Sequence, residues 1–398
     1  MSSPLQTSDP VVWSLLQAET KRQADTVELI ASENYTSPAV LEALGSIFTN
    51  KYAEGLPGKR YYGGTDVVDQ LERLCMERAL CAFGLDPAEW GVHVQPYSGS
   101  VANMAVYLAL LKPGDTIMGL DLPSGGHLSH GFQTPKRKVT AAATYYNSVS
   151  YKVGPDGLLD YDAIEEQAIH VGPRLLICGA SAYSRDWDYE RLRVTADRCG
   201  AYLMADIAHT SGFVATGLLK SPFTWCDVVT TTTHKTLRGP RSALIFYRKP
   251  LERQIAEAVF PGLQGGPHMN QVAAVAVQLR EVVTPEFREY MRLVRENARA
   301  LASALQARGF TIVTGGTDNH MFLVDLRNKA GLDGAMAEKM LGAAGISVNK
   351  NTIPGDTSAL RPAGIRIGTP AITTKGWRPE QMDALATKIV ESLKPILA

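Results

Sequence analysis

Short apolar runs alternate with amphipathic segments through the middle of the chain. The runs expected to form strands lie at 92–95, 116–120, 175–178, 202–207, 228–231 and 243–247. A segment with helical spacing of apolar residues, 189–199, stands between two of them. This alternation predicts an α/β fold, with a mostly parallel sheet and helices on both of its faces.

The flanking regions carry different patterns. Asp9-Pro10 and Ser37-Pro38 are typical helix starts, and Thr65 is expected to cap a long amphipathic helix. A charged amphipathic helix is expected over 285–308, followed by strands at 311–313, 321–325 and 346–348 and helices at 334–344 and 379–397. We therefore expect an N-terminal helical arm with polar, Gly-rich loops (1–64), a large α/β domain (65–283) and a smaller α+β domain (284–398).

Composition narrows the possible functions. The 398 residues include 40 Lys and Arg against 40 Asp and Glu, a balance that argues against general binding to nucleic acid or to an anionic membrane. No apolar run approaches the roughly 18 residues of a membrane span, and residues 1–22 lack a signal or transit pattern, so we expect a cytoplasmic protein. Five widely spaced cysteines without a C-x-x-C pair predict buried thiols, and neither a disulfide nor a zinc site.

A polar run over 230–240 directly follows an expected strand. Its four threonines, His234 and Lys235 would emerge at the carboxyl end of that strand, where open α/β sheets bind their ligands. Hydroxyl donors beside a cation suit a phosphorylated cofactor, and a lysine amine with a lowered pKa can form a Schiff base with an aldehyde. The alternative for a single lysine is a solvated surface position.

Asp206 follows the neighbouring expected strand. A carboxylate there suits a metal ligand, a ribose acceptor or the partner of a protonated pyridine nitrogen, and the third role fits best beside Lys235. A helix cap remains the alternative for Asp206.

Two further turns follow expected strands. The turn Ser98-Gly99-Ser100 suits binding of a phosphate, and an ordinary capped turn is the alternative. The imidazole of His127 is suited to stacking on a pyridine ring. A metal site at His127 and His130 is not supported, because no third ligand lies near them in the sequence. For His130 we expect a hydrogen-bonded structural role.

Together these runs resemble the serine hydroxymethyltransferase family. The resemblance covers essentially the whole chain, in the order LIASEN (29–34), KYAEG (51–55), PGKRYYGG (57–64), QPYSGS (95–100), TTTTHKTL (230–237), QGGPH (264–268) and GIRIGTP (364–370). It implies the fold type I of pyridoxal-phosphate-dependent transferases. The implied reaction is the reversible transfer of the hydroxymethyl carbon of L-serine to tetrahydrofolate, giving glycine and 5,10-methylenetetrahydrofolate.

The resemblance also implies roles for individual residues. Lys235 matches the Schiff-base lysine, Asp206 the partner of the ring nitrogen and His127 the stacking imidazole. The remaining cofactor positions are Ser98, Gly99 and Ser100 at the phosphate, Ser181 and His209 at the phenolic oxygen and the substrate carboxylate, His234 beside the lysine, and Tyr52 and Gly266 from the neighbouring subunit.

Substrate positions are implied in the same way. Arg366 matches the arginine that binds the amino-acid carboxylate, with Ser32 helping, and Glu54 matches the acid/base carboxylate. Tyr62 lines the site with Tyr52, and the folate-contacting positions are Leu122, Gly126 and Asn351. Because Tyr52, Glu54 and Gly266 are borrowed across an interface, a homodimer is expected. The short segment 248–260 lacks a long insertion of the eukaryotic type, so a tetramer stays open.

Two alternatives remain at this point. A pyridoxal-phosphate enzyme similar to threonine aldolase or alanine racemase would share Lys235 and Asp206 and need no folate, whereas Glu54 and Asn351 favour the folate-dependent reaction. A binding protein that keeps the fold without catalysis is the second alternative. All of the implied catalytic positions hold competent residue types, which favours an enzyme.

Overall fold

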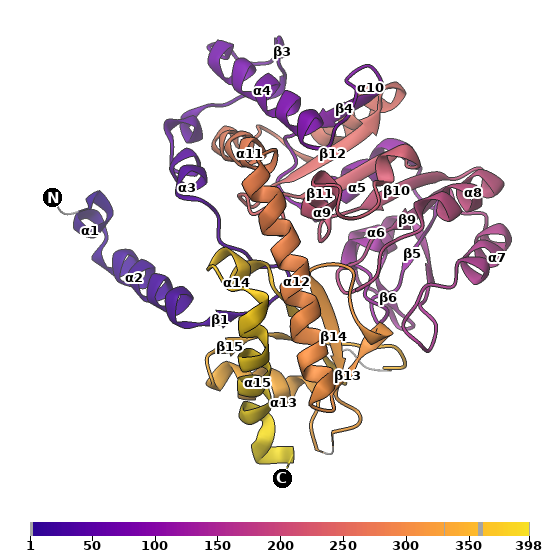
Figure 1. Ribbon diagram of the computed structural model, residues 1–398. Helices are drawn as coiled ribbons and strands as arrows, with labels where there is room; N and C mark the ends of the chain where they lie inside the picture. Colours follow the sequence, from indigo (N-terminus) through magenta and orange to yellow (C-terminus); the bar gives the residue numbers. More distant parts are fainter. Residues whose placement is uncertain (1–2, 330, 357–360, 398) are drawn as a thin grey trace.

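A seven-stranded sheet forms the centre of the computed structural model, which describes residues 3–329, 331–356 and 361–397 (Figure 1). The strand order is β4-β12-β11-β10-β9-β5-β8. Only β12 runs opposite to the other six strands, so the expected α/β class with a mostly parallel sheet is confirmed. The strands are β4 (Trp90–His93), β5 (Thr116–Leu120), β8 (Asn147–Tyr151), β9 (Leu175–Cys178), β10 (Tyr202–Asp206), β11 (Val228–Thr232) and β12 (Ala243–Arg248).

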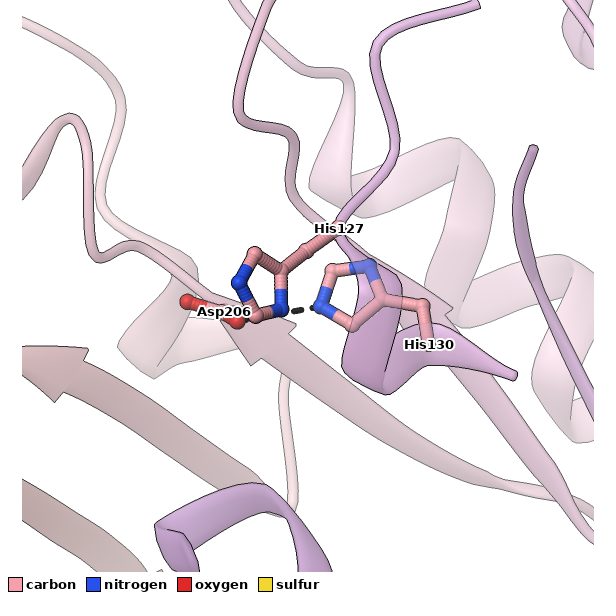
Figure 2. A group of neighbouring side chains, drawn as sticks. All are labelled: His127, His130 and Asp206. Atoms are coloured by element: carbon pink, nitrogen blue, oxygen red, sulfur yellow. Dashed lines mark hydrogen bonds and ion pairs between the residues drawn. The ribbon is translucent and has the colours of Figure 1, made fainter. Parts of the chain in front are cut away.

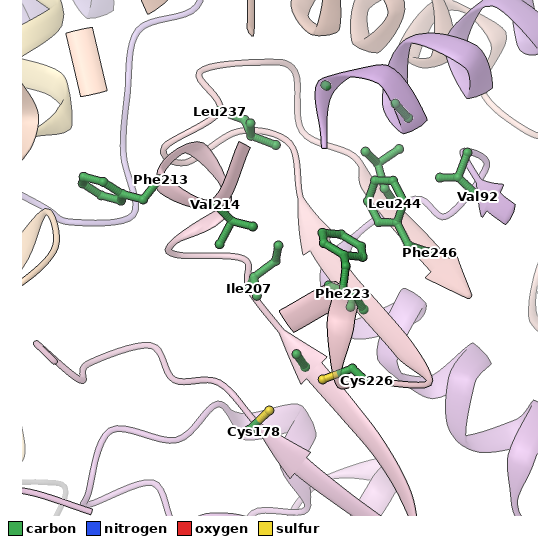
Figure 3. Close-up of a cluster of buried hydrophobic side chains, with 14 of the residues drawn as sticks. Val92, Cys178, Ile207, Phe213, Val214, Phe223, Cys226, Leu237, Leu244 and Phe246 are labelled. Atoms are coloured by element: carbon green, nitrogen blue, oxygen red, sulfur yellow. The ribbon is translucent and has the colours of Figure 1, made fainter. Parts of the chain in front are cut away.

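Alternate residues of these strands enter two hydrophobic cores, one on each face of the sheet. In β9, Leu175 and Ile177 pack on one face, and Leu176 and Cys178 on the other. One core is covered by α4 (Asp66–Ala82), α7 (Tyr161–Val171), α8 (Tyr189–Cys199), α9 (Ser211–Ala215) and α11 (Met269–Val282), and Figure 3 shows its centre. The other is covered by α5 (Gly99–Leu110), α6 (Ala141–Tyr145) and α10 (Glu252–Glu257). Burial on both faces explains the continuous apolar runs of the inner strands.

A four-stranded antiparallel sheet, β13-β14-β17-β16, forms a second layer. Its strands are β13 (Thr311–Ile312), β14 (Met321–Asp325), β16 (Asn349–Asn351) and β17 (Gly364–Gly368). Helices α12 (Pro285–Ala307), α13 (Gly334–Ala343) and α15 (Met382–Leu397) pack on it around a separate core. Figure 1 shows α12 running from beside α11 to this sheet. The expected α+β pattern after residue 284 is present.

The expected strand at 346–348 belongs to neither large sheet. Instead β15 (Ile346–Ser347) pairs in parallel with β1 (Val27–Glu28). Leu29, directly after β1, is fully buried in the core of the smaller layer. The N-terminal segment is therefore anchored to the C-terminal part of the chain.

Other helix starts follow the sequence expectations with one exception. Asp9 caps α2 (Pro10–Asp25) by accepting from two backbone N–H groups, and Ser37 caps α3 (Pro38–Leu44). Thr65 precedes α4, but its side chain makes no cap hydrogen bond. The remaining elements are α1 (Pro4–Ser8), η1 (Ile47–Asn50), β2 (Gly55–Leu56), β3 (Lys59–Arg60), η2 (Leu128–His130), β6 (Gln133–Thr134), β7 (Arg137–Lys138), η3 (Pro222–Thr224), η4 (Lys249–Leu251), η5 (Ala258–Leu263), η6 (Val313–Gly315), α14 (Pro370–Thr374) and η7 (Pro379–Gln381).

The five cysteines are all free thiols, as expected, but not all of them are buried. Cys75, Cys178 and Cys226 are buried, whereas Cys199 is partly exposed and Cys81 is exposed. Cys81 lies in α4, as does Cys75, but only Cys75 belongs to the core. Within the described ranges, no helix has both the length and the apolar character needed to cross a bilayer.

Candidate active site

A cavity of about 650 Å³ opens at the carboxyl ends of the central strands, next to the four-stranded sheet. Because β10 and β11 are parallel, Asp206 and the 230–240 run reach the same edge of the sheet. Most of the expected site residues line this cavity: Ser32, Ser98, Gly99, Ser100, Leu122, Gly126, His127, Ser181, Asp206, His209, His234, Lys235, Asn351 and Arg366. The fold thus brings together residues that are more than 300 positions apart in the sequence.

Lys235 lies in the loop that follows β11. Its carbonyl oxygen accepts from Asn34 Nδ2 at 2.9 Å and from the backbone N–H of Arg238 at 3.0 Å, which fixes the loop. Burial lowers the pKa of Lys235 to about 8, and the positive charges of Arg366 and Arg241 act in the same direction while Asp206 opposes them. In the described part of the chain the ammonium has no ion-pair partner. A buried amine with a lowered pKa is suited to nucleophilic attack on a carbonyl carbon.

Asp206 ends β10, and its side chain is about 10% exposed. His130 Nε2 donates to its Oδ2 at 3.0 Å (Figure 2). Asn103 Nδ2 also donates to Oδ2, at 2.8 Å, and the backbone N–H of Ala208 donates to Oδ1 at 3.1 Å. Burial raises the pKa of this carboxyl, but the hydrogen bond and the charge of His130 outweigh burial and hold the pKa below its usual value. Asp206 is therefore ionised and can accept a further hydrogen bond.

His127 and His130 flank Asp206. The ligating atoms of these three residues lie within 4.8 Å of one another, so the fold supplies the third group that the sequence spacing could not reveal. His130 Nε2 donates to Asp206, and a nitrogen that carries this hydrogen has no lone pair for a metal. Burial lowers the pKa of His127 to about 4, which keeps its imidazole neutral. The cluster is thus suited to binding a heteroaromatic ring with a protonated nitrogen.

The turn at Ser98 and Gly99 begins α5. Ser98 stands at the helix start without capping it through its side chain, and Ser98, Gly99 and Ser100 all line the cavity. The first backbone N–H groups of α5 therefore lie at the cavity wall without a side-chain acceptor from Ser98. A Cβ atom on Gly99 would lie 2.7 Å from the Thr232 methyl group, so this position requires glycine. Free N–H groups and the positive end of the helix dipole favour a phosphate here.

Arg366 enters the cavity from β17. Its Nη1 donates to the Ser181 carbonyl at 2.6 Å and its Nε to Asn349 Oδ1 at 3.0 Å, while Nη2 lies 3.5 Å from Ser32 Oγ. Burial lowers its pKa to about 10. In the described structure no carboxylate pairs with it. A buried, planar cation of this kind is suited to a carboxylate ligand.

Two of the expected histidines are held in neutral form by burial. His209 Nδ1 lies 3.2 Å from Nε2 of His320, a buried residue of the four-stranded layer, and burial puts the pKa of His209 well below its usual value. The pKa of His234 is lowered to about 3, again mainly by burial. His320 was not among the expected site residues. It adjoins His209 only because the two layers meet at the cavity.

The three positions expected to contact folate lie in the cavity wall. Leu122 and Gly126 follow β5, and Asn351 ends β16 on the opposite layer. A Cβ atom on Gly126 would overlap the Leu120 carbonyl oxygen, so this turn requires glycine. Thr232, one of the four threonines of the 230–240 run, also lines the cavity, as do Lys350 and Arg241, to which sequence reasoning gave no role.

Four expected residues are absent from the described lining of this cavity: Tyr52, Glu54, Tyr62 and Gly266. They form a separate group, in which the rings of Tyr52 and Tyr62 meet edge to face at 5.0 Å and Gly266 lies against Tyr52. Tyr52 and Tyr62 are 57% and 49% exposed. The loop that carries Glu54 is fixed by the buried guanidinium of Arg60, which donates to the carbonyl oxygens at 53 and 55.

The whole chain is similar to proteins of one known family. The family model described as serine hydroxymethyltransferase matches residues 5–389. The chain is 57% identical to the cytosolic serine hydroxymethyltransferase of Oryctolagus cuniculus, over 97% of this chain and 83% of the relative. It is 55% identical to serine hydroxymethyltransferase 3, chloroplastic, of Arabidopsis thaliana (97% and 74%) and 51% identical to the mitochondrial protein of Schizosaccharomyces pombe (98% and 83%). The chain belongs to the serine hydroxymethyltransferase family.

Proposed function

We propose that this chain transfers the hydroxymethyl carbon of L-serine reversibly to tetrahydrofolate, with pyridoxal phosphate bound in the central cavity. The observation that carries the proposal is that Lys235 and Asp206 line the same cavity. A buried amine of lowered pKa, which has no ion-pair partner in the described structure, and an ionised carboxylate are both available to one ligand. Family membership supports the same activity.

The residues around the cavity fit the cofactor. Lys235 would hold it through its aldehyde, the N–H groups at Ser98 to Ser100 would bind its phosphate, and Asp206 would accept from its ring nitrogen. His127 would lie against the ring, with Ser181, His209 and His234 around its edge. When bound, pyridoxal phosphate supplies an electron sink for the carbanion left at Cα of the amino acid. Asp206 contributes by keeping the ring-nitrogen proton in place.

Arg366 would bind the carboxylate of serine or glycine. Its Nη2 group faces Ser32 and the cavity, and no acidic residue of the described chain neutralises it. A guanidinium can donate two parallel hydrogen bonds to a carboxylate, which fixes the orientation of the amino acid as well as its affinity. Leu122, Gly126 and Asn351 would contact tetrahydrofolate from the two sides of the opening.

Glu54 would move the proton of the serine hydroxyl group, with Tyr52, Tyr62 and Gly266 completing the site from a second subunit. Two features support a homodimer. The four residues lie outside the cavity of their own chain, and two of them, Tyr52 and Tyr62, are exposed. The first 74 residues also expose many large apolar side chains, which a monomer would leave in water: Val11, Leu15, Leu41, Ile47, Tyr61 and Val67.

We also propose the domain limits 1–64, 65–283 and 284–398, and a cytoplasmic location. Two separate cores support a second limit in this part of the chain, although Leu29 joins the C-terminal core and the start of α12, from Phe287 to Val294, packs in the core of the large domain. Five free thiols are compatible with a reducing compartment. The relatives carry cytosolic, chloroplastic and mitochondrial names, so relationship alone does not choose among these compartments.

A single spectroscopic series tests the function. Purified protein incubated with pyridoxal phosphate should absorb visible light, and the band should shift when glycine and then tetrahydrofolate are added. Lys235→Ala should remove the band of the covalently held cofactor. Serine cleavage that is equally fast without tetrahydrofolate would favour an aldolase-like enzyme, and a colourless protein that takes up no cofactor would favour a non-catalytic binding protein.

A further inference from the structure

The buried amide of Asn103 connects the two groups that the proposed function places at the cofactor ring. Asn103 lies in α5, whose other buried side chains are mostly apolar, and it is 1% exposed. Its Nδ2 donates to Asp206 Oδ2 at 2.8 Å and to Ser129 Oγ at 2.8 Å. Its Oδ1 accepts from the hydroxyl group of Thr230 at 2.7 Å. The amide thus has a partner for each of its hydrogens and for its oxygen.

The chemistry of these groups fixes the direction of each hydrogen bond. An ionised Asp206 only accepts, so the atom of Asn103 that faces it is the NH₂ group. The same nitrogen only donates, so Ser129 Oγ accepts from it and keeps its own hydrogen for another partner. That partner is His127 Nδ1, at 2.7 Å, and the backbone N–H of Ser129 also donates to Nδ1 at 3.2 Å. His127 therefore carries its hydrogen on Nε2.

The arrangement also leaves one oxygen of Asp206 available. Asn103 and His130 both donate to Oδ2, whereas Oδ1 accepts only from the N–H of Ala208 among the described residues. A carboxylate oxygen can accept more than one hydrogen bond, so Oδ1 retains a lone pair for a ligand N–H. Oδ2 thus takes two of the three hydrogen bonds that hold the carboxylate in place.

We propose that Asn103 is a positioning residue that orients Asp206 directly and, through the hydroxyl group of Ser129, helps to hold His127 in its Nε2–H tautomer. This inference rests on the proposed binding of pyridoxal phosphate. Asn103 thus connects the carboxylate that would accept from the ring nitrogen with the imidazole that would lie against the ring. Loss of its donors would disturb both contacts with the cofactor while leaving Arg366 and the carboxylate site intact.

Asn103→Asp is the sharpest test because it keeps the shape and replaces the NH₂ donor with an acceptor facing Asp206. The dissociation constant of pyridoxal phosphate, from absorbance titration, should rise about 10- to 100-fold, the loss expected for a hydrogen bond to a charged group. In the reconstituted enzyme kcat should fall, while the KM for serine changes little. Ser129→Ala breaks only the branch to His127 and should give a smaller rise.

The matched control is Asn297→Asp in α12. Asn297 is equally buried and its Nδ2 also makes two donor bonds, to Thr373 Oγ1 at 2.8 Å and to the Trp377 carbonyl at 3.0 Å, but it does not line the cavity. The Asn297→Asp variant should have a lower melting temperature and an unchanged dissociation constant for the cofactor. An equal rise in both variants would mean that Asn103 is merely structural.

Two further outcomes decide between failure of this inference and failure of the proposed function. If the unaltered protein binds no pyridoxal phosphate, the proposed function is wrong. If it binds the cofactor and Asn103→Asp retains its affinity and kcat, only the role of Asn103 is wrong. Should Asn103→Asp not fold, Ser129→Ala and Thr230→Val replace it, and unaltered affinity and kcat in both would overturn the inference.

Discussion

Arg366 Nη1 donates to the carbonyl oxygen of Ser181 at 2.6 Å, joining the four-stranded sheet to the central sheet across 185 positions of sequence. The bond occupies one end of the guanidinium. The other end, Nη2, faces Ser32 and the cavity. The orientation of the cationic group is therefore set by the protein before an amino acid binds.

Arg366→Lys should keep the charge and lose the bidentate geometry. We expect the KM for serine to rise about 10- to 100-fold, because a lysine cannot donate two parallel hydrogen bonds to a carboxylate. Steady-state kinetics with saturating tetrahydrofolate would measure this change. Arg327→Lys is the control. Arg327 is an exposed arginine that follows β14 and pairs with Asp325, and its substitution should leave the KM for serine unchanged. An unchanged KM in Arg366→Lys would place the carboxylate elsewhere.

Glu54→Gln should retain the shape of the loop and lose the titrating group. Binding of pyridoxal phosphate should persist, while folate-dependent serine cleavage falls by about 10²- to 10⁴-fold, the usual contribution of a positioned acid or base. Stopped-flow absorbance and product formation would separate the two effects. Glu190→Gln, at the exposed start of α8, should behave like the unaltered protein. Full activity in Glu54→Gln would remove this residue from the mechanism.

Subunit mixing tests whether Glu54 acts on the cavity of a second chain. Glu54→Gln and Lys235→Ala should each be inactive alone. If the chains exchange at random, half of the dimers carry both variants and each has one intact site, so about a quarter of the unaltered activity should return. Two different affinity tags would isolate the mixed dimers. No recovery in purified mixed dimers would mean that Glu54 serves its own chain.

Stability should decrease as the pH falls below about 6.5. Burial lowers the pKa of His93 from 6.5 to about 4, so the unfolded chain binds its proton first and the contribution of His93 is lost between these values. In that window the free energy of unfolding should fall by about 1.4 kcal/mol per pH unit for each such histidine. Urea unfolding at several pH values measures the slope. In His93→Asn this slope should be smaller by the contribution of one proton, about 1.4 kcal/mol per pH unit. His170→Asn, which changes an exposed histidine, is the control and should leave the slope unchanged.

The inner strands could be predicted from the sequence because each is apolar on both faces. Strands β5 and β9 have the expected bounds. In contrast β8, with the sequence NSVSY, was missed, since it lies at the edge of the sheet and only Tyr151 of its five residues is buried. The strand at 346–348 was expected, but its partner β1 was not, because pairing between segments more than 300 residues apart leaves no local pattern.

The site was predictable where its residues stand in characteristic runs and not where they depend on contacts. Lys235, Asp206 and Arg366 lie in such runs and line one cavity. Asn103 lies within an apolar helix, GSVANMAVYLAL, where its amide has no sequence signal. His320 likewise becomes relevant only when the two layers meet beside His209. Contacts between layers are a property of the packed chain, which periodicity cannot reveal.

The pairing of β1 with β15 has a mechanical consequence. Leu29 donates its N–H to the carbonyl of Ser347 and accepts from the N–H of Gly368, so it is bonded to both β15 and β17. Ser32 follows three residues later, and Arg366 lies two residues before Gly368. If the C-terminal layer rotated relative to the central sheet, Ser32 and Arg366 would move together as one unit. Ser181, which follows β9, would remain with the central sheet.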